Sequence, residues 1–181
     1  MRSWYRAALV AAALVFSPAV AAAQLQLGAE LEAIFPGGDE LGNDTGVGYA
    51  GRLGYAIDGP MIEIVPELRI GYVNFAEPAD KTRLDVGLWR YTAGLRLGVG
   101  EILRPTVFAH IGYGDVVFGG PGGTIFEEGF GDSAFTWDAG LAFDLAILPL
   151  IDVGVHGAYN RLETSTAVDW WSAGVHAVLD F

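Results

Sequence analysis

Cysteine is absent from this chain of 181 residues. Without thiols the protein can form neither a disulfide framework nor a thiolate metal site. Lysine is also scarce, since Lys81 is the single example. The fold must therefore be held by backbone pairing, packing and the charges that are present.

Positive charge is the second shortage. The chain has 10 Lys and Arg residues against 22 Asp and Glu, a formal net charge of −12, and a sequence pI of about 4.4. Proteins that bind nucleic acid need a basic surface to contact phosphates. The composition therefore excludes that function, and we expect no nucleic-acid partner.

Long apolar runs are missing beyond residue 23, although 52% of the chain is hydrophobic. The one short run, residues 7–16, follows Arg2 and Arg6 and precedes the small residues 21–23. A basic start, a short apolar run and a small-residue exit are typical of a secretory signal peptide. We predict a cleaved signal over residues 1–23 and one mature domain over residues 24–181.

The mature sequence divides into eight segments in which apolar residues occupy every second position. The segments cover approximately residues 24–35, 46–57, 61–74, 86–99, 104–115, 134–145, 150–160 and 170–181. One face of each segment carries no charge. The opposite face holds Glu30, Glu32, Arg52, Glu63, Glu67, Arg69, Arg90, Arg96, His110, Asp138, Asp144, Asp152, His156, His176 and Asp180, with many glycines between them. This pattern predicts an all-β fold, an eight-stranded antiparallel up-and-down transmembrane barrel.

Alternation alone does not say which face points outward, because a soluble lipocalin-like barrel has the same period with its apolar face inside. The aromatic residues decide between the two. If the strands alternate in direction, Phe35, Tyr49, Tyr72, Trp89, Tyr113, Phe135, Tyr159 and Trp171 all fall at one boundary, and Tyr55, Phe143 and Phe181 lie at the other. Aromatic girdles of this kind mark the edges of a membrane. We predict that the apolar face meets lipid.

The connections alternate in length. The links at 58–60, 100–103 and 146–149 are short, whereas those at 36–45, 75–85, 116–133 and 161–169 are long and polar. Outer-membrane barrels have short periplasmic turns and long outer loops. We therefore expect the long loops on the cell surface and both ends of the mature chain in the periplasm.

Three stretches carry a resemblance to known proteins: RPTVFAHIGYG at 104–114, FTWDAGLAFDLAILPLIDVGVHGAYNRL at 135–162, and WWSAGVHAVLDF at 170–181. Together with the barrel pattern they resemble the small outer-membrane β-barrel superfamily of the OmpA membrane domain, OmpX-like proteins and porin-like surface antigens. The resemblance implies a location in the bacterial outer membrane. It also implies that the barrel-assembly machinery recognises the last strand through Ala173, Val175, Ala177, Leu179 and Phe181.

One residue does not match the strand pattern. Pro66 lies in mid-strand, where it removes a ladder hydrogen bond, and we predict a β-bulge there.

The inward charges admit two interpretations. Eight carboxylates face four arginines, and they could form either a packed ionic core or a narrow cation path. Because the interior of an eight-stranded barrel is mostly filled by side chains, we expect the core, held by Arg–carboxylate pairs. His110, His156 and His176 fall at similar depth near Asp138, which suggests a metal site or a hydrogen-bonded polar layer; we expect the layer and predict no metal ligands.

The sequence contains no arrangement of residues that is typical of a catalytic site. Ser172 and His176 share a face but lie four residues apart on one strand, about 13 Å, beyond hydrogen-bond reach. The Gly-rich stretch 114–124 lacks the Gly-Lys-Ser/Thr of a phosphate loop. We predict no catalytic and no cofactor-binding residues.

The sequence therefore predicts a non-enzymatic outer-membrane protein with a structural or surface-interaction role and with its specificity in four outer loops. A narrow, low-conductance porin-like channel is the first alternative, and a lipid-A-modifying hydrolase is the second. The expected partners are membrane lipid and lipopolysaccharide, the assembly machinery that reads Phe181, and a surface ligand of the loops. The loops are acidic, with Asp39, Glu40, Asp44, Glu77, Asp80, Glu127, Glu128, Asp132 and Glu163, and we expect these residues to be solvated rather than to share divalent cations with lipopolysaccharide phosphates.

Overall fold

The computed structural model describes residues 23–37, 45–59, 61–75, 85–119, 130–148, 150–165 and 167–181. They form eight strands: β1 (Ala23–Pro36), β2 (Gly46–Asp58), β3 (Ile62–Phe75), β4 (Asp85–Val99), β5 (Leu103–Gly119), β6 (Phe130–Leu148), β7 (Ile151–Glu163) and β8 (Val168–Asp180). Among these residues there is no helix that is long and apolar enough to cross a membrane. The predicted signal over residues 1–23 lies outside the described residues except for Ala23, which already belongs to β1.

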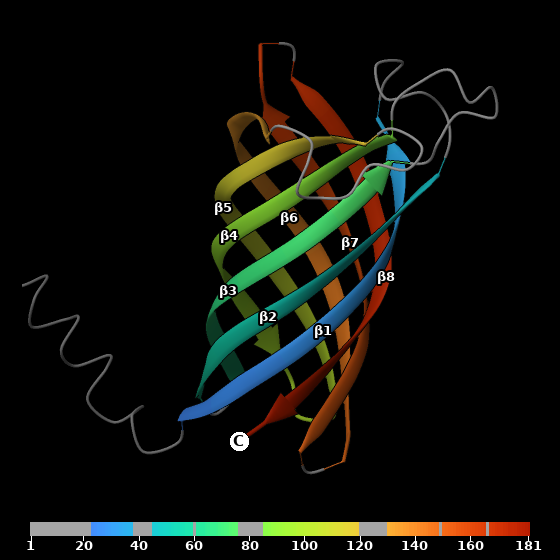
Figure 1. Cartoon of the computed structure of the whole chain (residues 1–181). Helices are drawn as coiled ribbons and strands as arrows, with labels where there is room; N and C mark the ends of the chain where they lie inside the picture. Colours follow the sequence, from blue (N-terminus) through green and yellow to red (C-terminus); the bar gives the residue numbers. More distant parts are fainter. Residues whose placement is uncertain are drawn as a thin grey trace, which may run out of the picture.

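The strands pair in chain order, and β8 pairs with β1, so the sheet closes into an antiparallel barrel (Figure 1). Starting at Leu27 of β1, each residue can be followed to its partner on the next strand, and this path reaches Asp169 of β8 after crossing all eight strands. The carbonyl of Asp169 accepts a hydrogen bond from the Gly37 amide, at the end of β1. Position 37 lies ten residues beyond position 27, so each circuit shifts the register by that amount. A shift of this size tilts the strands by about 40° from the barrel axis. The predicted fold class is confirmed.

The two faces separate as the alternation predicted. None of the side chains predicted to point outward is buried, and most are exposed, for example Leu27, Leu68 and Val155, each more than half exposed. Of the charged residues and histidines predicted to point inward, all are buried except Glu63 and Asp180, which are partly buried. The barrel is therefore apolar outside and polar within for most of its length.

The aromatic girdle forms cross-strand contacts. Tyr72 packs against Tyr49 and Trp89, with ring centroids 5.6 and 5.1 Å apart. On the other side of the barrel, Tyr159 packs against Trp171 at 5.2 Å. The register also pairs Phe35 with Trp171 and Tyr113 with Phe135. The predicted residues therefore adjoin one another at one boundary of the apolar surface.

The two ends of the barrel differ as expected, and we call them the turn end and the loop end. At the turn end, residues 59–61, 100–102 and 149–150 connect successive strands, and Gly100 takes a positive φ of 115° that favours glycine. At the loop end, residues 38–44, 76–84, 120–129 and 166 lie outside the described residues, so most of the predicted outer loops do too. The strands extend into the third predicted loop, since β5 continues to Gly119 and β6 begins at Phe130.

The predicted β-bulge at Pro66 is wrong. Pro66 pairs with Leu95 in an unbroken register along β4. On the other side, pairing with β2 lapses at Tyr55 and Ala56 and then resumes in the same register. The missing proline donor is thus accommodated by a local gap in one ladder, without an inserted residue. The register shifts instead between Asp115 and Val117 and between Ala146 and Leu148.

Candidate functional site: the barrel lumen

The centre of the lumen is held by ion pairs, some between neighbouring strands and some between strands that are not neighbours. Arg69 of β3 donates through Nε to Glu30 at 2.7 Å and through Nη2 to Glu32 at 3.0 Å, both on β1. Arg52 belongs to β2, the strand between β1 and β3, and lies 3.7 Å from Glu30 and 3.5 Å from Glu67. All five side chains are at most 6% exposed. The predicted Arg–carboxylate core is confirmed, and it ties β1 to β3 across β2.

Arg96 extends this network toward the opposite wall. Its Nε lies 3.4 Å from Glu67, and its Nη1 lies 3.9 Å from Asp144 on β6. The guanidinium also covers the ring of Phe108, with its central carbon 5.0 Å from the ring centroid. Such cation–π contacts stabilise a cation that has left water. The charges are thus connected from one side of the lumen to the other.

The three histidines lie within the same layer. His110 contacts Asp138 through Nδ1 at 2.6 Å and Glu67 through Nε2 at 2.7 Å. His176 contacts Asp144 through Nε2 at 2.5 Å, and its Nδ1 lies 3.2 Å from Nδ1 of His156. The prediction of a hydrogen-bonded polar layer is confirmed. Among the described residues no group of three or more His, Asp or Glu side chains is placed to hold a metal ion.

Toward the loop end, the polar layer gives way to an apolar plug, which was not predicted from the sequence. Arg90 donates to Asp138 at 2.6 Å and to Asn160 at 2.7 Å, and its guanidinium covers the ring of Trp170 at 5.3 Å. Beyond it, a cluster of buried apolar side chains fills the lumen: Ile34, Val73, Phe75, Leu88, Ala134, Leu162 and Trp170. Phe75 and Trp170 meet edge to face at 5.6 Å. The plug closes the described part of the lumen at this end.

The signal that could have revealed the plug is the phase of each strand. Ile34 follows Glu30 and Glu32 at every second position, and Leu88 and Leu162 continue the inward rows of Arg90 and Asn160 in the same way. Charge alone identifies only the polar members of each inward row, so a prediction from charge omits the inward apolar residues.

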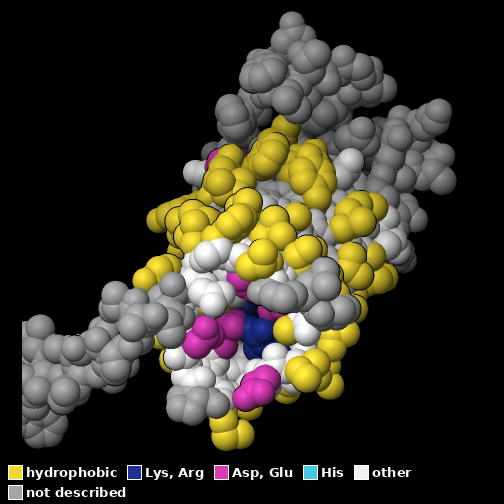
Figure 2. Space-filling view, turned by 90° about the horizontal axis from the view of Figure 1, so that it is seen from below, with side chains coloured by type: hydrophobic (Ala, Val, Ile, Leu, Met, Phe, Trp, Pro, Cys, Tyr) yellow, Lys and Arg dark blue, Asp and Glu magenta, His cyan; other side chains and the backbone are white. Residues whose placement is uncertain are grey.

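At the turn end, the lumen closes on another ion-pair group that includes one arginine missed from the sequence. Arg104 pairs with Glu63 of β3 and, at 2.7 Å, with Asp152 of β7. Figure 2 looks into this end and shows basic side chains in the centre with acidic ones beside them, inside an apolar rim. Arg104 shares the inward phase of His110 on β5. The lumen therefore contains at least five arginines rather than the four that were predicted.

Among the described residues, ion pairs and packed apolar side chains occupy the lumen. A cavity between Glu30, Arg69, His110, Asp138 and His156 has a volume of about 10 Å³, which is roughly the space that one water molecule needs. Ser172 accepts a hydrogen bond from Asn160 at 3.1 Å, whereas His176 contacts Asp144 and His156. Within the described residues, the geometry places these groups in a packed core.

The comparisons agree with this architecture. The sequence matches the family model described as "Outer membrane protein beta-barrel domain" over residues 7–179. A comparison with curated proteins gives no significant match.

Solved structures share the fold at low sequence identity. Neisserial surface protein A is 14% identical with a TM-score of 0.67, and the alignment covers 88% of this chain and 97% of that one. Ail from Yersinia pestis is 10% identical with a TM-score of 0.53, over 88% and 97% of the two chains. The N-terminal barrel domain of OprF from Pseudomonas aeruginosa is 15% identical with a TM-score of 0.51, over 88% and 99%. Because its closed eight-stranded barrel and nearly its whole sequence match, this chain belongs to the bacterial outer membrane protein β-barrel family.

Proposed function

We propose that this protein is a non-enzymatic outer-membrane barrel with a structural or surface-interaction role, and that its specificity lies in the four outer loops. The observation that carries the proposal is the closed lumen. Ion pairs bridge its middle, and the apolar plug fills its loop end. A barrel interior packed in this way serves as a scaffold, which leaves the loops to contact other molecules.

For ions to pass, both the ion-pair network in the middle of the lumen and the apolar plug at its loop end would have to open. Conduction needs either a water-filled path or groups that replace an ion's hydration shell. Here the arginines and carboxylates already pair with each other, and Phe75, Leu88 and Trp170 are nearly or completely buried in the apolar plug. Breaking a buried ion pair costs about 3–5 kcal/mol, and exposing the plug costs more. These costs favour a scaffold over the alternative of a narrow pore.

The charge of the loops indicates the kind of surface partner. Over the predicted loops, the acidic residues outnumber Lys81, Arg83 and Arg161. Opposite charge across an interface speeds association and selects partners. The loops therefore favour a basic partner. One structure of Ail holds a heparin analogue, sucrose octasulfate, but the acidic loops of this chain disfavour such a polyanion.

The loops can be tested separately from the barrel. We would refold the mature protein in nanodiscs and compare it with a variant whose residues 38–44, 76–84 and 120–129 are replaced by short Gly-Asn-rich linkers. Biolayer interferometry with poly-lysine as the basic probe and heparin as the acidic one should show poly-lysine binding that the variant loses. Equal binding by both proteins, or a preference for heparin, would contradict the proposed role of the loops.

The non-enzymatic part of the proposal needs its own measurement. Mass spectrometry of lipid A from cells with and without the protein should give the same spectrum. A lipid A species that appears only with the protein would instead establish the hydrolase alternative.

A further inference from the structure

A hollow lies on the outer surface of the barrel, on the wall formed by β5, β6, β7, β8 and β1. It has a volume of about 750 Å³ and an almost entirely apolar lining, and its size is within the range of small-ligand sites. The hollow belongs to the lipid-facing surface and is continuous with the apolar belt around the barrel. The bilayer is therefore the medium that covers it.

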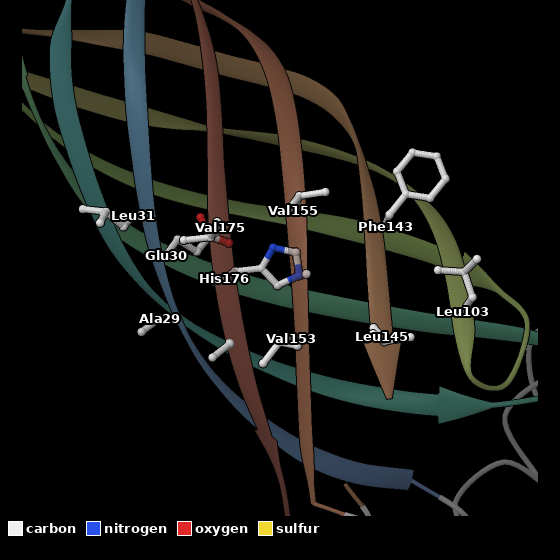
Figure 3. Close-up of a pocket in the computed structure, with 12 residues that line it drawn as sticks. Ala29, Glu30, Leu31, Leu103, Phe143, Leu145, Val153, Val155, Val175 and His176 are labelled. Atoms are coloured by element: carbon white, nitrogen blue, oxygen red, sulfur yellow. The ribbon is translucent and has the colours of Figure 1, made fainter. Parts of the chain in front are cut away.

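The register explains the shape of the hollow. Leu31, Val175, Val155 and Phe143 pair across four strands into one row of outward side chains. Ala29, Ala177, Val153, Leu145 and Leu103 form the next row toward the turn end. Figure 3 shows the labelled members of the two rows one above the other, with Glu30 and His176 between them. The hollow is the trough between these rows.

Small residues line part of this open trough. Ala29 and Ala177 pair across β1 and β8, and each projects only a methyl group. Between the rows, Glu30 and His176 turn their side chains into the lumen and are buried there, so mainly backbone lies beneath the trough. The second row crosses four interstrand spacings of about 4.8 Å, which gives a length of about 19 Å. Because the strands are tilted, the trough runs obliquely from mid-barrel to the turn end.

We propose that this trough is a binding site for one acyl chain of a membrane lipid. The trough is comparable in length to the hydrocarbon thickness of one leaflet, about 15 Å, and it faces the leaflet at the turn end. No charged side chain points outward among its lining residues, so it recognises the chain rather than the headgroup. A chain seated there fills space that the small residues Ala29 and Ala177 leave empty, and it gains the dispersion contacts that a void forfeits.

Native mass spectrometry of the refolded protein in mild detergent tests the site, with dipalmitoyl phosphatidylethanolamine as the probe. The wild-type protein should bind a first lipid at least tenfold more tightly than the variant Ala29→Leu/Ala177→Leu, in which two side chains fill the trough. The matched control is Ala93→Leu/Ala109→Leu, which adds the same groups to exposed positions on β4 and β5 outside the trough. The control should bind like the wild type. Where the double variant does not refold, Ala29→Leu alone replaces it.

Two further comparisons sharpen the test. Dipalmitoyl phosphatidylglycerol should bind as tightly as the phosphatidylethanolamine, because the affinity of the site does not depend on the charge of the headgroup. A dihexanoyl lipid should bind far more weakly, because its acyl chains are too short to fill the trough. Equal affinity of all three proteins for the first lipid would overturn the proposal, since it would indicate unspecific lipid around the barrel. A dimer that disappears only in the trough-filled variant would also overturn it, because the occupant would then be a second copy of the chain.

Discussion

Removing the guanidinium of Arg69 tests the ionic core most sharply. Arg69 donates two charge-assisted hydrogen bonds, at 2.7 Å to Glu30 and at 3.0 Å to Glu32, and its side chain is 6% exposed. Glu30 would retain Arg52 and Arg96 at 3.7 and 3.8 Å. Glu32 would keep only His156 among its described ionic partners, at 3.7 Å. Arg69→Met should therefore leave one carboxylate buried without an arginine.

The expected loss is about 3–5 kcal/mol, the usual cost of removing one partner of a buried ion pair. Urea unfolding of the protein in phospholipid vesicles, followed by tryptophan fluorescence, measures the free energy of unfolding. Adding Glu32→Gln to Arg69→Met should recover about 1–3 kcal/mol, because it removes the stranded charge. Arg161→Met serves as the control: Arg161 forms partly exposed pairs with Glu163 and Asp169, and its loss should change stability by less than about 1 kcal/mol.

Two results would refute this reasoning. The first is a loss below about 1 kcal/mol for Arg69→Met, which would place the Arg69 side chain in water. The second is further destabilisation on adding Glu32→Gln, which would mean that Glu32 does not depend on Arg69.

Three other predictions concern the lipid face, the plug and the last strand. Leu95→Arg should destabilise the refolded barrel by about 2–4 kcal/mol, with Leu95→Met as the control, and unchanged stability in urea unfolding would mean that the apolar face does not meet lipid. Trp170→Ala should cost about 3–5 kcal/mol, because Trp170 is completely buried against Phe75 and Arg90; a loss below 1 kcal/mol would contradict the plug. Phe181→Ala should lower the amount of folded protein in cells severalfold and leave the stability of the refolded protein nearly unchanged. The stability should not change because the Phe181 ring is exposed and its contacts with Leu25 are backbone hydrogen bonds. Normal assembly of the variant in cells would refute the role of Phe181 as an assembly signal.

The sequence was sufficient to predict the strands and their faces, because one physical requirement repeats in all eight. A strand that spans a membrane alternates between lipid and lumen, so Leu27, Leu68 and Val155 could be placed outside before any partner was known. The ends of β5 and β6 were predicted too short because alternation breaks there. Val116, Val117 and Phe118 are consecutive apolar residues, and the register shifts beside them.

The interior could be predicted only in part, because the height of a residue depends on the register shift around the whole barrel. The sequence placed Glu30 and Arg69 inside, but their contact across β2 follows from the register, in which Arg69 pairs with Arg52 and Arg52 pairs with Gly28. The plug was missed for a different reason. Ile34 and Leu88 look like lipid-facing residues by type, and only their phase relative to Glu32 and Arg90 places them inside. At Pro66 the rule that a proline interrupts a ladder was right, but it could not distinguish an inserted residue from a local gap.

The central property proposed for this protein is a lumen closed to ions, and the conductance of the protein in a bilayer is the most direct measure of this property. Refolded wild-type protein should be added to planar lipid bilayers at increasing voltage in a simple potassium chloride solution. A lumen closed by Arg69, Arg96 and the plug around Trp170 predicts an electrically silent membrane. Stable, discrete openings of the wild-type protein would contradict the closed lumen and, with it, the proposal of a scaffold for surface loops.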